Sequence, residues 1–191
     1  MPLRVIAGSA RGIELRAPRG RGTRPTAGRL REALFSMLEA ADVDFTDTLD
    51  LYAGSGALGI EALSRGAERC TFVEHSARAC ETLRANLERT GFADRALVVR
   101  GQVERWRATG DGTHTLVLAD PPYHDATSWT AIERAVTGAL TDAATIVVEH
   151  AAREVPPASL AGRSLWRDRR QGEGAVAVYR SGPASERGET G

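Results

Sequence analysis

Apolar residues recur along this chain with two different spacings, and the alternation between them predicts the order of strands and helices. Short apolar runs bounded by turn residues predict buried strands at 48–52, 70–74, 96–100, 115–119 and 144–149. Apolar residues three and four apart predict helices at 57–65, 76–90 and 128–139, with a short helical piece near 102–107. Strands that alternate with helices in this way form βαβ units and a parallel sheet.

Both ends of the chain break this alternation. Residues 3–7 and 13–17 are apolar-rich runs on either side of a short link, and they predict an N-terminal β-hairpin. A helix is predicted over 26–40, and a closing hairpin over 163–170 and 174–180. The last residues, 181–191, are rich in Gly, Ser and Glu, so we expect them to be disordered.

The composition is that of an ordinary globular domain. Of the 191 residues, 42% are hydrophobic and 26% are charged, which fits one domain. No apolar run is long enough to cross a membrane and the N-terminus lacks a secretory signal, so we expect a cytoplasmic protein. The two cysteines, Cys70 and Cys80, fall in predicted core elements. We therefore expect buried, reduced thiols and no metal site.

The net charge is zero, but the charges are unevenly distributed. Residues 1–31 contain eight arginines and one acid, Glu14, so this segment carries +7 and the rest of the chain −7. Such asymmetry favours an arm that binds a polyanion, although a solvated basic segment is the alternative. The arginines expected to contact nucleic acid are Arg4, Arg11, Arg16, Arg19, Arg21 and Arg24. Arg167, Arg169 and Arg170 form either a second basic patch or a solvated strand face.

A glycine-rich turn follows the first predicted sheet strand. Gly54, Gly56 and Gly59 satisfy the pattern G-x-G-x-x-G between a strand and a helix, which is the context that a nucleotide-binding turn requires. Glu74 ends the next strand, where an acid can accept hydrogen bonds from ribose hydroxyls. Asp50, four residues before Gly54, disfavours a pyrophosphate and suits a cation such as an ammonium group. The residues thus indicate a nucleoside ligand that carries positive charge.

A second motif, Asp120-Pro121-Pro122-Tyr123, follows the predicted strand at 115–119. Consecutive prolines stiffen the loop and expose its carbonyl oxygens. The Asp120 carboxylate and the Pro121 carbonyl are two acceptors for the N–H bonds of an exocyclic amine, and Tyr123 offers a ring for stacking. This arrangement fits a flat base that bears an amino group.

Both motifs resemble those of known enzymes. The turn from Asp50 to Gly56 resembles the S-adenosylmethionine (SAM) motif of class I methyltransferases, which favours SAM over NAD. The second motif resembles the (Asp/Asn/Ser)-Pro-Pro-(Tyr/Phe/Trp) sequence of amino-methyltransferases that act on adenine N6, cytosine N4 or guanine N2. Both lie where strands end, and ligands of open α/β sheets bind at that edge.

The N-terminal residues narrow the resemblance to one family. Arg4-Val5-Ile6-Ala7-Gly8, Arg11-Gly12 and Thr23-Arg24-Pro25-Thr26, with the two motifs, resemble the RsmD family of 16S rRNA guanine-N2 methyltransferases from residue 4 to about 180. The resemblance implies methyl transfer from SAM to guanine N2 near position 966 of the rRNA, on the assembled small ribosomal subunit. We also expect the protein to be a monomer. It implies a Rossmann-like class I methyltransferase fold, with a mostly parallel seven-stranded sheet, helices on both faces and a hairpin extension.

The same resemblance assigns the site residues. It gives the reacting base to Asp120, Pro121, Pro122 and Tyr123, and the cofactor to Asp50, Tyr52, Gly54, Gly56 and Glu74, with Gln102 and Val103 placed near adenine by position. The expected domains are a basic arm at 1–25, the methyltransferase domain at 26–180 and the tail. Arg24 and Thr26 could border the methionine end of SAM or bind an RNA phosphate; the alternative is that Thr26 caps its helix and Arg24 is solvated.

Three other functions compete with this interpretation. A DNA adenine-N6 or cytosine-N4 methyltransferase would use the same pocket, but 191 residues leave no room for a separate DNA-recognition domain. A nucleic-acid-binding protein without turnover would not need Asp50, Glu74 and Asp120. An NAD-dependent oxidoreductase leaves the Asp-Pro-Pro-Tyr motif unexplained.

Overall fold

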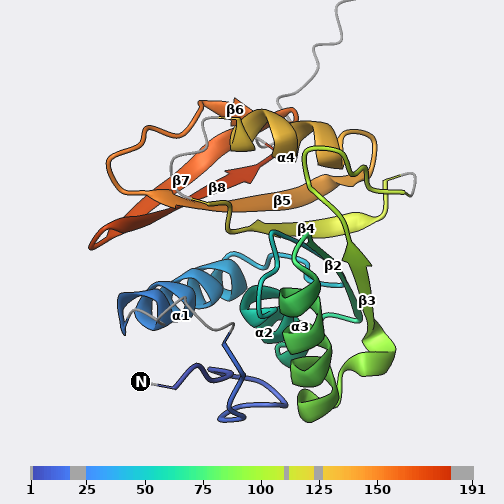
Figure 1. The fold of residues 1–191 in the computed structure, drawn as a ribbon. Coiled ribbons are helices and arrows are strands. Elements are labelled where there is room, and N and C mark those ends of the chain that lie inside the picture. Colours follow the sequence, from blue (N-terminus) through green and yellow to red (C-terminus); the bar gives the residue numbers. More distant parts are fainter. Residues whose placement is uncertain (1, 18–24, 110–111, 123–126, 182–191) are drawn as a thin grey trace, which may run out of the picture.

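The computed structural model describes residues 2–17, 25–109, 112–122 and 127–181, with the backbone alone for 25–27. Its centre is a sheet of eight strands in the order β3-β2-β1-β4-β5-β8-β7-β6 (Figure 1). The strands are β1 (Asp47–Leu51), β2 (Arg69–Glu74), β3 (Ala96–Arg100), β4 (His114–Ala119), β5 (Leu140–Ala151), β6 (Ser159–Leu160), β7 (Arg163–Gln171) and β8 (Gly174–Arg180). The five strands from β3 to β5 are parallel, and β8, β7 and β6 continue the sheet antiparallel.

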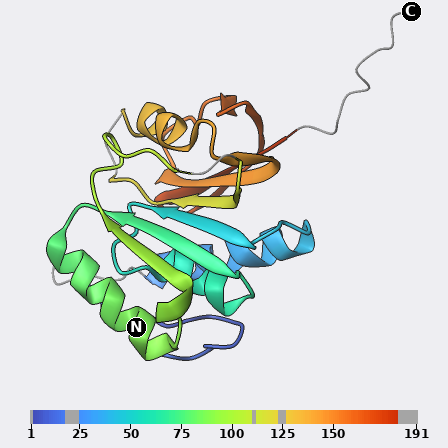
Figure 2. The same cartoon turned by 90° about the vertical axis from the view of Figure 1, so that its right-hand side faces the viewer.

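The helices cover both faces of this sheet, as predicted. They are α1 (Pro25–Ala40), α2 (Ala57–Ser64), α3 (Ala77–Thr90) and α4 (Ser128–Val136), with a 3-10 turn, η1 (Ala93–Arg95). Figure 2 shows α4 on one side of the sheet and α1, α2 and α3 on the other. Side chains alternate between the faces of a strand, so each face has its own core. Phe72 and Leu118 belong to the core beneath α1–α3, whereas Leu51 and Val117 pack towards α4.

Four details of the sequence prediction need correction. The sheet has eight strands, because Ser159–Leu160 pairs with Arg163–Ser164 across a tight turn. That turn has Ala161 and Gly162 at positive φ, as two-residue hairpins require, but Ala-Gly is a weak signal for it. The helical piece at 102–107 is a hydrogen-bonded turn at 103–105. Helix α4 ends at Val136 instead of 139, and β5 extends over Leu140–Ala151 instead of 144–149.

Other predictions about the core are confirmed. Cys70 and Cys80 are free, buried thiols, and burial raises the pKa of each.

No helix within the described ranges is both long and apolar enough to cross a membrane. The predicted tail lies outside the described residues from 182 onward, so its disorder stays a prediction.

The N-terminal segment forms a loose hairpin that packs against α2 and α3 (Figure 1). Its two arms meet through an antiparallel bridge between Arg4 and Glu14, and the Leu15 N–H donates to the Leu3 carbonyl at 2.8 Å. Val5 and Leu15 are buried in the core beneath the sheet. Residues 2–16 are therefore part of the packed structure and not a free arm.

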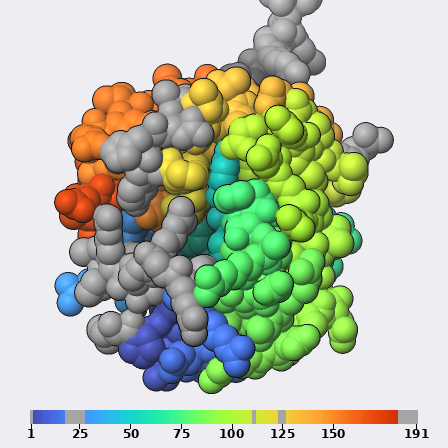
Figure 3. Space-filling view, viewed as in Figure 1, coloured from blue at the N-terminus to red at the C-terminus, as the bar shows by residue number. Residues whose placement is uncertain are grey.

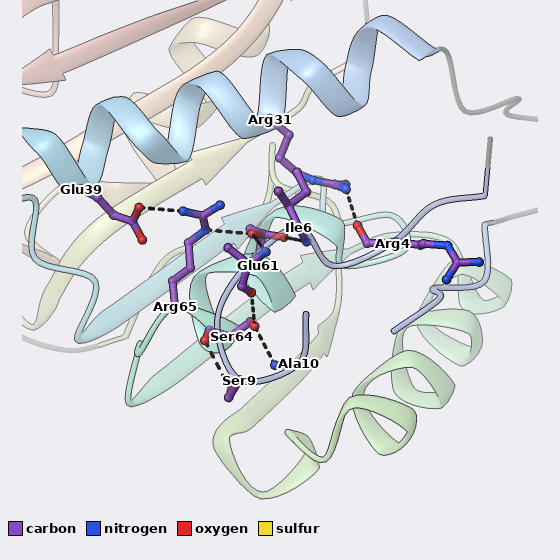
Figure 4. Close-up of polar contacts among 10 residues, drawn as sticks. Arg4, Ile6, Ser9, Ala10, Arg31, Glu39, Glu61, Ser64 and Arg65 are labelled. Atoms are coloured by element: carbon purple, nitrogen blue, oxygen red, sulfur yellow. Dashed lines mark hydrogen bonds and ion pairs between the residues drawn. The ribbon is translucent and has the colours of Figure 1, made fainter. Parts of the chain in front are cut away.

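A buried carboxylate on α2 holds this segment in place (Figure 4). Glu61 is 1% exposed, and it accepts the N–H of Ile6 at 2.8 Å and the N–H of Ala7 at 3.0 Å. Arg65, one helical turn later, donates its Nε–H to Glu61 at 2.8 Å. A buried charge is tolerated only when it is paired and hydrogen-bonded, and these three donors meet that requirement for Glu61.

We expect Glu61→Ala to destabilise the protein strongly. The change leaves two backbone N–H groups and the Arg65 guanidinium without their acceptor, which costs about 3–5 kcal/mol when a buried ion pair is broken. Urea unfolding followed by circular dichroism measures the loss. Glu39→Gln is the matched control, since Glu39 pairs with the same arginine at 2.7 Å but is 49% exposed and should cost less than about 1 kcal/mol. Equal losses in the two variants would contradict this account.

Candidate active site

The carboxyl ends of β1, β2, β3 and β4 lead into one pocket. Parallel strands end at the same edge of a sheet, and in open α/β sheets that edge is where ligands bind. The pocket has a volume of about 200 Å³, and its lining residues are Tyr52, Val73, Glu74, His75, Gly101, Gln102, Val103, Glu104, Asp120 and Pro122. In the space-filling view the surface is hollowed there, with cyan-coloured chain near the end of β1 at its floor (Figure 3). Residues from both sequence motifs thus share one pocket.

The glycine turn joins β1 to α2 with an unusual backbone. Tyr52, Gly54 and Gly56 all have positive φ, at 59°, 56° and 80°. A Cβ atom on Gly56 would also lie 2.2 Å from Leu83 Cδ1, so only glycine fits there. Gly59 has an ordinary backbone, but its Cβ would lie 2.3 Å from Phe72 Cε1, so its role is the close packing of α2 on the sheet.

Asp50 lies behind this turn and not in the wall of the pocket. Its carboxylate is 1% exposed and accepts the N–H of Gly59, in the first turn of α2, at 2.9 Å. The pKa of Asp50 is raised to about 7. Burial is the largest cause and the charge of Glu74 adds to it, while the hydrogen bond from Gly59 acts in the opposite direction. The predicted contact between Asp50 and an ammonium group stays a prediction, and the observed contact is with the backbone of α2.

Glu74 is placed at the junction of the turn and the pocket. Its Oε2 accepts the N–H of Gly54 at 2.9 Å, and its Oε1 accepts the N–H of Ser76 at 2.7 Å. His75 Nδ1 lies 3.1 Å from the same Oε1. A carboxylate has about four lone-pair sites, so Glu74 can hold the turn and still accept hydrogen bonds from a ligand in the pocket.

The opposite wall comes from the loop after β3. Gln102 is exposed, whereas Val103 is 2% exposed and belongs to the core beneath α4. The Tyr52 hydroxyl donates to Glu104 Oε1 at 3.0 Å, which joins the glycine turn to this loop across the pocket. A slot between a carboxylate on one side and an apolar residue on the other suits a ribose with a flat base.

The Asp-Pro-Pro turn forms the third side. The Asp120 N–H lies 3.4 Å from the Leu51 carbonyl, which continues the pairing of β4 with β1 for one residue beyond the strand. Asp120 and Pro122 line the pocket, and Pro121 is buried beside them. Tyr123 lies outside the described residues, so its stacking role stays a prediction.

Sequence reasoning missed a buried polar side chain that supports the glycine turn. Asn86 on α3 is 0% exposed, and its Nδ2 donates to the carbonyl of Ser55 at 2.9 Å and to that of Arg16 at 3.0 Å. Its Oδ1 accepts the N–H of Arg16 at 2.8 Å. An asparagine among Leu83 and Leu87, on the apolar side of a helix, is the signal that could have identified it. His75 and Glu104 were also missed, and only their positions after strand ends could have suggested them.

The predicted nucleic-acid residues fall into three groups. The Arg4 guanidinium already has partners within the chain: it donates to the Gly12 carbonyl at 3.1 Å and forms an ion pair with Glu14 at 3.3 Å. Arg11 and Arg16 are exposed, and neither guanidinium has an ion pair within the described part of the chain. The hydrogen bonds of Asn86 place Arg16 beside the glycine turn. The remaining arginines lie outside the described residues: Arg19, Arg21 and Arg24.

The sheet has parallel strands in the order β3-β2-β1-β4-β5 and continues with the antiparallel strands β8, β7 and β6. Together with a glycine turn after β1 and an acid at the end of β2, this arrangement defines a class I methyltransferase. Members of this class take their methyl group from SAM. The family model described as "Conserved hypothetical protein 95" matches residues 3–180. The chain belongs to this family, the RsmD family, as its N-terminal residues and two motifs indicated.

Similar proteins support this assignment. Escherichia coli "Ribosomal RNA small subunit methyltransferase D" is 37% identical over 182 residues, covering 93% of this chain and 89% of that protein. The solved structure of the E. coli protein yhhF has a TM-score of 0.79 and 35% identity, over 95% of this chain and 98% of that one. An RNA methyltransferase from Salinibacter ruber, solved with S-adenosyl-L-homocysteine, shares the fold at 21% identity and a TM-score of 0.57, over 81% of this chain and 94% of that one.

Asp50→Asn is expected to remove a pH dependence of stability. Because the folded pKa of about 7 exceeds the ordinary value of 3.8, the folded chain binds a proton that the unfolded chain lacks between these pH values. The stabilising effect of this proton is complete at low pH and is lost as pH rises towards 7. Over this range the free energy of unfolding falls by on the order of 1 kcal/mol per pH unit.

Urea unfolding of both proteins at pH 5, 6, 7 and 8 tests this expectation. The free energy of unfolding of the wild type, minus that of the variant, should fall from pH 5 to 7 and stay level above pH 7. A difference that is constant over the whole range would mean that the carboxyl group is ionised in the folded protein.

Proposed function

We propose that this protein transfers a methyl group from SAM to the exocyclic N2 amine of a guanine in 16S rRNA, near position 966, within the small ribosomal subunit. The observation that carries the proposal is the shared pocket: Glu74, at the end of β2, and Asp120, at the end of β4, line the same cavity. A cofactor bound by Glu74 and a base bound by Asp120 would therefore lie next to each other in one cavity. Membership of the RsmD family adds support for the reaction and for the RNA.

The residues present fit SAM. Glu74 keeps acceptor sites for ribose hydroxyls while it holds Gly54, and Val103 offers an apolar surface for adenine beside the exposed Gln102. Among the described residues no arginine lines the pocket, and the titratable residues that do are the acids Glu74, Glu104 and Asp120 with Tyr52 and His75. Acidic walls suit a ligand with an ammonium and a sulfonium group better than a dinucleotide.

The chain's own residues act on the amine. An exocyclic amine is a poor nucleophile, because its lone pair is delocalised into the ring. In the proposed complex the Asp120 carboxylate and the Pro121 carbonyl accept the two N–H bonds, which favours a tetrahedral nitrogen and frees the lone pair. Bound SAM supplies an electrophilic methyl carbon on sulfur. Asp120 would stabilise the positive charge that develops on nitrogen as its lone pair bonds to the methyl carbon in place of sulfur, and the proton of the methylated nitrogen would pass to solvent.

Methylation assays on defined substrates test the proposal. The protein is incubated with radiolabelled SAM and one of three substrates: small subunits from cells that lack the corresponding methyltransferase, naked 16S rRNA, or duplex DNA. Mass spectrometry then identifies the modified nucleoside. We expect N2-methylguanosine on the subunit. Methylated adenine or cytosine would overturn the choice of base, and no transfer to any substrate would favour a binding protein without turnover.

Asp120→Ala should separate catalysis from cofactor binding. We expect methyl transfer to fall at least about a hundredfold, the scale of a lost transition-state contact, while SAM affinity changes only a few-fold. Single-turnover rates at saturating RNA and calorimetric titration of SAM measure the two effects. Asp94→Ala, at an exposed aspartate of η1, is the control and should keep the wild-type rate. Methyl transfer by the Asp120→Ala variant at close to the wild-type rate would show that Asp120 is not catalytic.

The proposed role of the N-terminal arginines needs point variants. Deletion of residues 1–20 would expose Glu61 and Asn86, so it would test folding as much as RNA binding. Arg11→Gln and Arg16→Gln keep the backbone contacts. Each should lower the magnitude of the salt dependence of RNA binding by about one ion, with no change in melting temperature. Filter binding between 50 and 200 mM salt measures this, and an unchanged slope in both variants would exclude these two contacts.

A further inference from the structure

A second concavity, unrelated to the pocket at the strand ends, lies between α1 and β7. It is an open groove of about 730 Å³. One wall consists of Met37, Ala40 and Ala41 at the end of α1, and the other of Trp166–Arg170 on β7 with Arg180 at the end of β8. The α1 wall carries no charge within the groove, whereas the strand wall carries four arginines and one aspartate.

Sheet register directs three of these arginines to the α1 side. Arg167 pairs with Val178 and Arg169 pairs with Val176, and both valines belong to the core beneath α1–α3. Arg180 lies two residues beyond Val178 on the same face of β8, because side chains alternate along a strand. Arg167 and Arg169 are exposed, and Arg180 is half-buried. The groove therefore receives a row of guanidinium groups.

The one acid of this strand wall does not neutralise the row. Asp168 pairs in register with Ala177, which belongs to the core beneath α4. Its carboxylate lies 3.2 Å from His150 Nε2 and 3.3 Å from Arg170 Nε. In the parts of the chain that the structure covers, none of Arg167, Arg169 and Arg180 forms an ion pair with a carboxylate.

Trp166 organises two of the three guanidinium groups. The ring is 36% exposed, and Arg167 Cζ and Arg180 Cζ lie 5.0 and 5.2 Å from its centroid. Cation–π contacts of this kind restrict long side chains before a ligand binds, so less conformational entropy is lost on binding. Arginine's planar fork matches phosphate, and its plane also stacks on bases.

The groove lies across the sheet from the reacting residue. Arg169 pairs with Val176, and Val176 pairs with Glu149, which is level with Asp120 because Val148 pairs with Ala119. Strands β4 and β7 are separated by β5 and β8, which corresponds to about 14 Å at about 4.8 Å per strand. A ligand that contacts both the groove and Asp120 must therefore be longer than one nucleotide.

From these observations we propose that the α1–β7 groove is a second RNA-binding surface, which holds the phosphate backbone of the substrate at a distance from the reacting base. The proposal rests on the proposed function for the identity of the polyanion. Binding through phosphates contributes affinity and orientation without reading sequence. The groove would thus orient a large RNA on the enzyme, while the pocket selects the base.

An edge strand can carry charges simply to prevent pairing with another chain. Beyond Ser164 the outer edge of β7 has no neighbour among the described residues, so this role is compatible with its arginines. It does not require three arginines on one face, or a tryptophan between two of them. The two roles differ in one measurable property, since only RNA binding makes the salt dependence of affinity depend on these arginines.

The test compares two double variants that each remove two positive charges. Arg167→Gln/Arg169→Gln changes the groove, and Arg84→Gln/Arg89→Gln changes two exposed arginines of α3 that have no ion pair among the described residues. Affinity for 16S rRNA is measured by filter binding between 50 and 200 mM salt. We expect the groove variant to lower the magnitude of the log–log slope by about two and to weaken binding at least tenfold at low salt, with the control close to wild type.

Two further measurements keep the result interpretable. Melting temperature and SAM affinity should be unchanged in both double variants, because the arginines lie outside the core and the pocket. Trp166→Leu should weaken RNA binding a few-fold with an unchanged slope, since all charges remain but the cation–π contacts are lost. A loss of RNA affinity that accompanies a loss of SAM affinity would indicate damage to the fold and would count against the proposal.

The outcomes separate this proposal from the proposed function. A groove variant with the wild-type slope overturns the second surface, even if the wild type methylates the small subunit. A wild type that binds RNA through the groove but transfers no methyl group overturns the proposed function and leaves the surface. If RNA binding is unchanged and binding of poly-L-glutamate is weakened instead, the groove recognises an acidic protein and our proposal is wrong.

Discussion

Between β1 and α2 the chain reverses through three residues with positive φ, and this turn places Tyr52 in the wall of the pocket. Three buried polar side chains from three elements hold it. Glu74 of β2 accepts the N–H of Gly54, Asp50 of β1 accepts the N–H of Gly59, and Asn86 of α3 donates to the carbonyl of Ser55. Buried polar groups are costly unless they are hydrogen-bonded, so the turn and its supports stabilise one another.

Asn86 extends this network to the N-terminal segment. The same amide group bonds both the glycine turn and the backbone of Arg16. A basic residue is thereby fixed next to the turn that is proposed to bind SAM, and Glu61 fixes the preceding residues on α2. The segment that the charge distribution suggested was an independent arm is packed against the domain, and buried polar contacts hold the backbone of Arg16 close to the glycine turn.

Much of this fold was predictable because its signals are local. Apolar runs identified all the longer strands, and Gly54, Gly56 and Gly59 marked the turn after β1. The joint presence of Glu74 and Asp120 in one pocket followed from the rule that parallel strands share an edge.

What could not be predicted depends on contacts between distant residues. The two-residue strand β6 is too short to show a period. The contact of Asp50 with α2, the bond between Tyr52 and Glu104, and the roles of Glu61 and Asn86 all join residues that are far apart or on different elements. Spacing along the chain carries no information about such pairs. A basic patch of Arg167, Arg169 and Arg170 was one of two alternatives, and the groove itself was not predicted. Sheet register decides which arginines share a face, and it separates Arg170 from the other two.

The anchoring of the N-terminal segment has a consequence for the order of assembly. Its acceptors on α2 lie 54 and 55 residues further along the chain, and its partner on α3 lies 70 residues further. Contacts of such long sequence separation form late, because loop closure must precede them. During synthesis this segment leaves the ribosome before α2 and α3, so it must remain without its partners until they are made. We therefore expect it to become ordered late, although it is made early, and its ordering to complete the hydrogen bonds of Asn86 beside the glycine turn.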